Sequence, residues 1–280
     1  MLIAIQHAEF DDLRGPSLSR LLQQIEGRGR VNVIASRRRE HPSVFGTRLW
    51  EYVEACGGPV ICLEDDVQVP RGFEAACEAA FEAGGGESLS LHLQAPGLRD
   101  VAATGARWAR CYWLSTVACI LTPKDARDLL DFAASLPWAF RSQVAHDNVA
   151  IHFAWARQRP WLATIPCLAT HDGVLPSTLG YDAHPNRGPA VAINAGEAAP
   201  LDWPSSLGAA FTVNPWASAG WMTTIRDSLR SEGGVCAACM VRPAAIGSAH
   251  AALCRPCVMS FVGTAMGVNT QVATLSVPAT

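Results

Sequence analysis

Three consecutive acidic residues, Glu64, Asp65 and Asp66, follow the apolar run 60–63 and are the first candidates for chemistry. Like charges this close raise one another's pKa, so they are costly to crowd together. A divalent cation would remove that cost, and Mg²⁺ and Mn²⁺ prefer carboxylate and phosphate oxygens. The triplet therefore suits a metal site for a nucleotide diphosphate, but a solvated acidic turn without a ligand explains it equally well.

Four cysteines form a second candidate site, because they occur as two Cys-x-x-Cys pairs, Cys236 with Cys239 and Cys254 with Cys257. Four thiolates in two such knuckles are what tetrahedral Zn²⁺ requires, and a site filled by four cysteines is structural. We read no secretion signal at the N-terminus and expect a cytoplasmic protein, in which zinc is favoured over local disulfides or redox chemistry. Such a module could bind nucleic acid, stabilise the fold or form a dimer contact.

Apolar periodicity predicts the elements that must position the acidic triplet. Strands are expected at 2–6, 31–35, 60–63, 88–93, 111–121 and 161–168, and helices near 18–25, 49–55, 123–133 and 147–157. Thr122 is expected to cap the helix that begins at Pro123. Strands that alternate with helices indicate an α/β fold with a mainly parallel sheet flanked by helices, and such sheets bind ligands at the carboxyl ends of their strands. The triplet stands at one of these ends.

The composition is that of a folded chain with a substantial core, since 49% of its 280 residues are hydrophobic. Residues 1–180 carry the α/β pattern. Residues 181–230 are rich in Pro, Gly, Ala and Asn and are expected to form a loop-rich extension or linker, and 231–280 a zinc-ribbon-like module and tail. No apolar run is long enough for a membrane span. The net charge of −3 gives no global footprint for nucleic acid, so DNA or RNA would have to be bound by a local patch.

The string ICLEDDVQVPRGF around the triplet resembles the metal-binding, D-x-D-like segment of GT-A glycosyltransferases. The resemblance extends over roughly residues 1–180 and is nearest to lipopolysaccharide-type transferases of the family 25 kind. It implies a GT-A (Rossmann-like) fold and a Mn²⁺- or Mg²⁺-dependent transfer from a nucleotide sugar, with a UDP-sugar as the expected donor. The acceptor would be a glycan or lipid-linked glycan or, if the zinc module touches DNA, a modified DNA base as in phage-type DNA glycosylation.

The resemblance also implies roles for single residues. Asp66 would be a direct metal ligand, and Asp65 or Glu64 would contact the ribose or a metal-bound water. AHDNVAIHFAW is similar to the segment that supplies a catalytic base, here Asp147, which would give inversion at the anomeric carbon. THDGVLPSTLG is similar to the segment that adds a histidine to the metal, here His171. A helix cap at Asp147 and a structural histidine at 171 are the simpler alternatives.

Arginines near the expected donor site are candidates for binding the nucleotide, because guanidinium groups bind phosphate in bidentate fashion. Arg14, in the loop after the first strand, could stack on or pair with the nucleotide. Arg48, near the start of a helix, is the other candidate, whereas the arginine run 37–39 is interpreted mainly as a solvated loop.

Two other functions are compatible with parts of the sequence. A metal-dependent hydrolase or nuclease could use Asp65, Asp66, His146, Asp147 and His171, but no second acidic cluster with two-metal spacing is present in the sequence. A non-enzymatic zinc-ribbon protein that binds nucleic acid would leave the acidic strand end without a role. A transferase is therefore the preferred prediction.

Overall fold

The computed structural model describes residues 1–26, 30–93, 98–112, 114–136, 146–157, 159–171, 191–204, 211–213, 246–247 and 252–253. The chain divides into two compact units, Met1–Pro215 and Trp216–Thr280. The predicted zinc ligands Cys236, Cys239, Cys254 and Cys257 lie outside the described residues. The candidate site at the acidic triplet belongs to the first unit.

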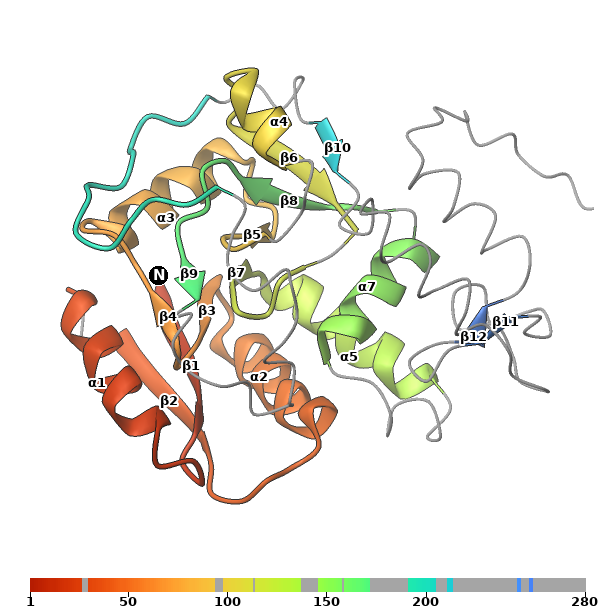
Figure 1. Cartoon of the computed structure of the whole chain (residues 1–280). Coiled ribbons are helices and arrows are strands. Elements are labelled where there is room, and N and C mark those ends of the chain that lie inside the picture. The colour runs from red at the N-terminus through yellow and green to blue at the C-terminus, as the bar shows by residue number, and fades with distance from the viewer. Residues whose placement is uncertain are drawn as a thin grey trace, which may run out of the picture. The chain divides into compact units, whose positions relative to one another are not determined.

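An eight-stranded sheet forms the centre of the first unit, in the order β10-β6-β8-β5-β7-β3-β1-β2 (Figure 1). Its strands are β1 (Leu2–Ala8), β2 (Val31–Ser36), β3 (Val60–Glu64), β5 (Leu89–Ser90), β6 (Trp108–Cys111), β7 (Ala118–Leu121), β8 (Trp161–Thr164) and β10 (Phe211–Val213). β1 is parallel to β2 and β3, whereas β7 is antiparallel to both β3 and β5. β8 is parallel to β5 and antiparallel to β6, which is parallel to β10. The predicted α/β class is confirmed, but the sheet is mixed.

Helices cover both faces of this sheet. They are α1 (Arg14–Gln24), α2 (Pro42–Cys56), α3 (Phe73–Ala83), α4 (Leu98–Ala103), α5 (Pro123–Ser135) and α7 (His146–Ala156). Alternate residues of a strand point to opposite faces, and Ile3, Ile5 and Ile61 share one buried cluster with Leu21 of α1 and Phe73 of α3. On the other side, α2, α5 and α7 pack against one another. The cap predicted for α5 is confirmed, because the side chain of Thr122 accepts a hydrogen bond from the backbone N–H of Asp125 at 3.2 Å.

Residues 111–121, expected to form one strand, contain the end of β6 and all of β7. The two strands have different neighbours: β6 lies between β10 and β8, and β7 lies between β5 and β3. A single straight strand could not occupy both positions in the sheet. Apolar content alone does not distinguish the two strands from the connection between them.

The first unit extends beyond residue 180, where the α/β domain was expected to end. Within the expected linker, Ile193 and Trp203 are buried in the main core cluster, and the Trp203 ring lies 5.1 Å from that of Trp108. β10 also adds a strand to the sheet. A segment rich in proline and glycine has little helical or strand periodicity, yet a few large apolar side chains suffice to bury it.

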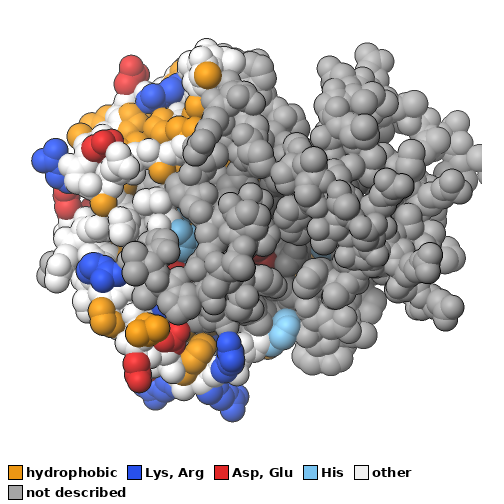
Figure 2. Space-filling view, in the orientation of Figure 1, with side chains coloured by type: hydrophobic (Ala, Val, Ile, Leu, Met, Phe, Trp, Pro, Cys, Tyr) orange, Lys and Arg blue, Asp and Glu red, His pale blue; other side chains and the backbone are white. Residues whose placement is uncertain are grey.

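Two further observations concern surfaces and the second unit. No helix of the described residues is long and apolar enough to cross a membrane. On the face shown in Figure 2, Lys and Arg side chains of the described residues are interspersed with Asp and Glu. In the second unit, β11 (Ile246–Gly247) pairs antiparallel with β12 (Ala252–Leu253), with Ile246 opposite Leu253.

Candidate metal centre

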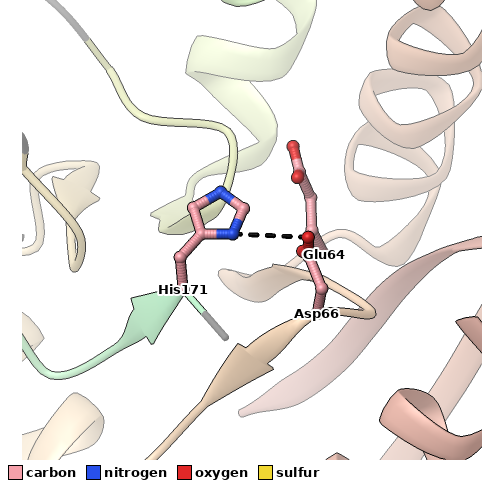
Figure 3. A group of neighbouring side chains, drawn as sticks. All are labelled: Glu64, Asp66 and His171. Atoms are coloured by element: carbon pink, nitrogen blue, oxygen red, sulfur yellow. Dashed lines mark ion pairs between the residues drawn. The ribbon is translucent and has the colours of Figure 1, made fainter. Parts of the chain in front are cut away.

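A short ladder beyond the main sheet brings two distant parts of the chain to the acidic triplet. Asp65 and Asp66 form a turn after β3, and β4 (Val67–Gln68) continues from it. β4 pairs antiparallel with β9 (Thr170–His171), and Val67 lies opposite His171. His171 Nδ1 consequently lies 3.3 Å from Asp66 Oδ2, as the dashed line in Figure 3 shows. The two residues that the resemblance implied as metal ligands are thus neighbours.

Glu64, Asp66 and His171 form a group with the chemistry of a metal centre. Each offers one ligand atom, and the three atoms lie within 4.8 Å of one another. The Asp66 side chain is 1% exposed, and its Oδ1 has no hydrogen-bond partner among the described residues. A buried oxygen without a partner costs about 1–3 kcal/mol, which a cation would offset. The two carboxylates suit Mn²⁺ or Mg²⁺, and the imidazole is a ligand for Mn²⁺ rather than for Mg²⁺, so the donor set fits Mn²⁺ better.

The two carboxyl groups of this triad differ in their affinity for a proton. Burial raises the pKa of Glu64 to about 7 and the charge of Asp66 adds to the rise, while His171 and Arg14 oppose it. Burial also acts to raise the pKa of Asp66, but the hydrogen bond and charge of His171, together with Arg14, bring it below its usual value. Near neutral pH, Asp66 is therefore ionised while Glu64 is partly protonated, and a cation would displace the Glu64 proton.

Arg14, the first residue of α1, is the internal counter-ion of the acidic residues. Its Nη1 lies 2.9 Å from Asp65 Oδ1 and 2.7 Å from Asp66 Oδ2, and its side chain is buried. Burial would lower the pKa of Arg14, but the carboxylates of Asp66 and Asp65 raise it above its usual value. The guanidinium group predicted to contact the nucleotide is therefore already bound to two carboxylates of the protein.

Asp65 connects β3 to the end of β1. Its Oδ2 lies 2.7 Å from His7 Nδ1 and accepts a hydrogen bond of 3.0 Å from the Ala8 backbone N–H, and its Oδ1 accepts from Arg14. Asp65 is buried and does not belong to the triad of possible ligands. Its predicted contact with the ribose or a metal-bound water stays a prediction, and both of its oxygens already have protein partners.

The other predicted residues lie outside the triad. Asp147, the expected base, is in the first turn of α7, a position consistent with stabilisation of the helix N-terminus. Arg48, on α2, forms an ion pair with Glu40, and its guanidinium lies 5.1 Å from the centre of the Phe45 ring. The four cysteines expected to bind zinc, as noted, lie outside the described residues.

His92 is a neighbour of the triad that sequence reasoning missed. It lies just after β5, and its ring meets that of His171 edge-on, with centroids 5.5 Å apart. Burial, followed by the charge of His171, lowers the pKa of His92 to about 3 against the opposing influence of Ala169 and Asp66. The ring is therefore neutral. The available signal was the strand alternation itself, in which Ser88, Ser90 and His92 alternate with leucines and end at the carboxyl edge.

No protein-family model matches the chain, and no curated protein matches it. Among solved structures, the chain is similar to A197 from STIV, with a TM-score of 0.39 and 14% sequence identity, over 61% of this chain and 85% of that one.

We expect Arg14→Met to lower the free energy of unfolding by about 3–5 kcal/mol, because it leaves Asp65 and Asp66 buried without their cation. Adding Asp66→Asn should recover part of this loss, since the double variant buries one uncompensated charge fewer. Urea unfolding without divalent cations measures both effects. Additive losses in the double variant would contradict the role of Arg14 as counter-ion.

We expect Glu64 to make the metal-free protein less stable as pH rises. Its pKa in the folded protein, about 7, lies above the usual value of 4.5, so the folded state binds this proton more tightly. That stabilisation is fully present below the usual pKa and is lost as pH rises through about 7. Urea unfolding at pH 5 and pH 8, with EDTA, should therefore show a smaller pH dependence in Glu64→Gln than in the wild type. An identical pH dependence would contradict the assignment.

Proposed function

We propose that this chain is a metal-dependent glycosyltransferase of the GT-A type, which transfers a sugar from a nucleotide-sugar donor to an acceptor hydroxyl. The observation that carries the proposal is the triad of Glu64, Asp66 and His171 at the carboxyl end of β3, with one ligand atom from each within 4.8 Å of the others. Ligands of α/β sheets bind at this edge. The GT-A assignment itself rests on the string ICLEDDVQVPRGF around the triad.

The charges at the site supply a reason for metal dependence. When His171 is deprotonated, as a metal ligand must be, and all three acids are ionised, one guanidinium leaves the cluster of Glu64, Asp65, Asp66 and Arg14 with about two net negative charges, which would repel a diphosphate. A divalent cation held by the triad supplies the positive charge that binds the diphosphate and stabilises it as a leaving group. Arg14 holds Asp65 and Asp66 in place while Glu64 gives up its proton.

Asp147 is the proposed general base that accepts the proton of the attacking hydroxyl. A carboxylate in this role leads to inversion when it acts on the face opposite the leaving group. The acceptor belongs to the same proposal: a glycan or lipid-linked glycan is preferred, and a modified DNA base is the alternative. Mn²⁺ or Mg²⁺ and a UDP-sugar are the proposed cofactor and donor.

The central test is donor binding by Asp66→Asn. In a thermal-shift panel of UDP-glucose, UDP-galactose, UDP-N-acetylglucosamine and GDP-mannose, we expect the wild type to be stabilised by at least one donor when Mn²⁺ is present. A ligand at 100 times its Kd stabilises by about 2.7 kcal/mol. Asp66→Asn should lose this stabilisation and remain folded, because the substitution removes a buried charge while keeping the shape of the side chain.

A matched control and a kinetic contrast complete this test. Asp128→Asn removes an acid of α5 that pairs with Lys124 and should leave donor binding unchanged. Asp147→Asn should bind the donor normally but transfer or hydrolyse it about 10²–10⁴-fold more slowly. Retention of Mn²⁺-dependent donor binding by Asp66→Asn would contradict the metal-site assignment. Cleavage of nucleic acid with Mn²⁺, without binding of any nucleotide sugar, would favour the nuclease alternative.

We also propose that Cys236, Cys239, Cys254 and Cys257 bind one structural zinc ion. Their spacing carries this part of the proposal. The antiparallel strands β11 and β12 lie between the two Cys-x-x-Cys pairs in the sequence. The zinc would stabilise the C-terminal module, and acceptor recognition is the further role that it could serve.

Purified protein should therefore contain about one zinc per chain that mild chelation does not remove, because a four-thiolate site binds tightly and is coupled to local folding. The double substitution of Cys236 and Cys239 by serine should release the zinc, whereas Cys56→Ser, which removes a thiol of α2, should not. Elemental analysis measures both. Donor binding should survive in each variant, and absence of zinc from the wild type would refute the site. Absence of DNA binding by the wild type even at low salt would leave a glycan as the acceptor.

A further inference from the structure

The imidazole of His92 is held in one orientation and one tautomer. Its Nδ1 lies 3.2 Å from the backbone oxygen of Ala169. A carbonyl oxygen can only accept, so Nδ1 carries the hydrogen and Nε2 keeps a lone pair. The backbone is fixed as well, because Ser90 Oγ donates to the His92 carbonyl at 2.9 Å and the Ala169 N–H donates to the Leu91 carbonyl at 3.1 Å.

The Nε2 atom of His92 is a buried acceptor without a partner. The residue is 0% exposed, and Nε2 makes no hydrogen bond with the described residues. A buried acceptor that stays unsatisfied destabilises the fold by about 1–3 kcal/mol. Such groups are explained by an enclosed water, an ion or a functional partner that arrives with a ligand.

His92 lies beside the proposed metal centre but is not one of its ligands. β5 and β3 are both antiparallel to β7, so their carboxyl ends, followed by His92 and Asp66, lie at one edge of the sheet. The His92 ring lies 5.5 Å from the ring of His171, while the group with ligand atoms in metal range contains only Glu64, Asp66 and His171 among the described residues. A group attached to a diphosphate at that centre would therefore reach the surroundings of His92.

We propose that His92 is a specificity-determining residue whose Nε2 accepts a hydrogen bond from a hydroxyl group of the transferred sugar. This inference rests on the proposed function, and it identifies one contact between the protein and the sugar of the donor. Because Nε2 can only accept, it selects a hydroxyl at that position and disfavours a deoxy or carbonyl group there. A site built to bind a hydroxyl discriminates against an analogue that lacks it, since its own polar atom is then left without a partner.

Two substitutions separate the two ring nitrogens. The amide of asparagine can take the place of Nδ1 and keep the bond to Ala169, but it does not reach the position of Nε2. The amide oxygen of glutamine can reach that position. His152→Asn is the matched control, because His152 is another buried imidazole, whose pKa is lowered to about 4 by burial, and it lies on α7, which packs against α2 and α5.

The experiment measures by calorimetry, with Mn²⁺ present, the Kd of a nucleotide sugar and the Kd of its free nucleotide. The pair is UDP-glucose and UDP, unless another donor binds more tightly, in which case that donor and its nucleotide are used. We expect His92→Asn to raise the Kd of the donor by about 3- to 10-fold, the range for the loss of one neutral hydrogen bond, and to leave the Kd of the free nucleotide unchanged. His92→Gln should recover part of the loss, and His152→Asn should match the wild type.

Other outcomes overturn the inference. An equal loss of affinity for nucleotide and donor in His92→Asn would show that the partner of Nε2 is a metal-bound water. No loss of affinity for either would show that its partner is an enclosed water. If His92→Asn does not fold, monodeoxy donors on the wild type replace it, and tolerance of every one of them overturns the contact. Failure of the wild type to bind any nucleotide sugar refutes the proposed function, whereas binding that is indifferent to His92 refutes only the sugar contact.

Discussion

The ion pairs of Arg14 with Asp65 and Asp66 are the interaction on which the rest of the site depends. One guanidinium nitrogen contacts both carboxylates in a buried position, and the remaining oxygen of Asp65 binds the end of β1. The start of α1, the end of β1 and the turn after β3 are thereby tied together. Buried charges that are paired in this way are strongly destabilising when one partner is removed. Asp66 Oδ1 makes no hydrogen bond with the residues that the structure describes, so the ion pairs hold this member of the triad in place but leave one of its oxygens unsatisfied.

Neighbouring acids in the triplet have different tasks because successive side chains leave the chain in different directions. Asp65 turns toward β1 and acts inside the protein, while Glu64 and Asp66 share the triad with His171. Their environments separate their proton affinities, since Asp66 is close to two groups that favour its charge and Glu64 is dominated by burial. This separation gives the metal-free site one fixed negative charge and one that responds to pH near neutrality.

Local patterns in the sequence were sufficient for much of the fold, and contacts between distant residues account for what they missed. The strand before Glu64 and the cap at Thr122 are written in adjacent residues, and both are found in the structure. The approach of His171 to Asp66 was expected only from a resemblance, because the β4–β9 ladder has two residues on each strand and no periodicity to detect. The commitment of Arg14 to two carboxylates and the burial of Trp203 against Trp108 likewise depend on tertiary packing.

The two-rung ladder between β4 and β9 also has a consequence for folding. His171 and Asp66 are far apart in the sequence, so their approach requires the closure of a long chain loop, which costs conformational entropy. The two residue pairs of the β4–β9 ladder are too few to offset much of this cost by themselves. A cation shared by Glu64, Asp66 and His171 would act as a staple across that loop. Occupancy of the centre would then report that both halves of the first unit have come together, and a partly folded chain would have no high-affinity place for the ion.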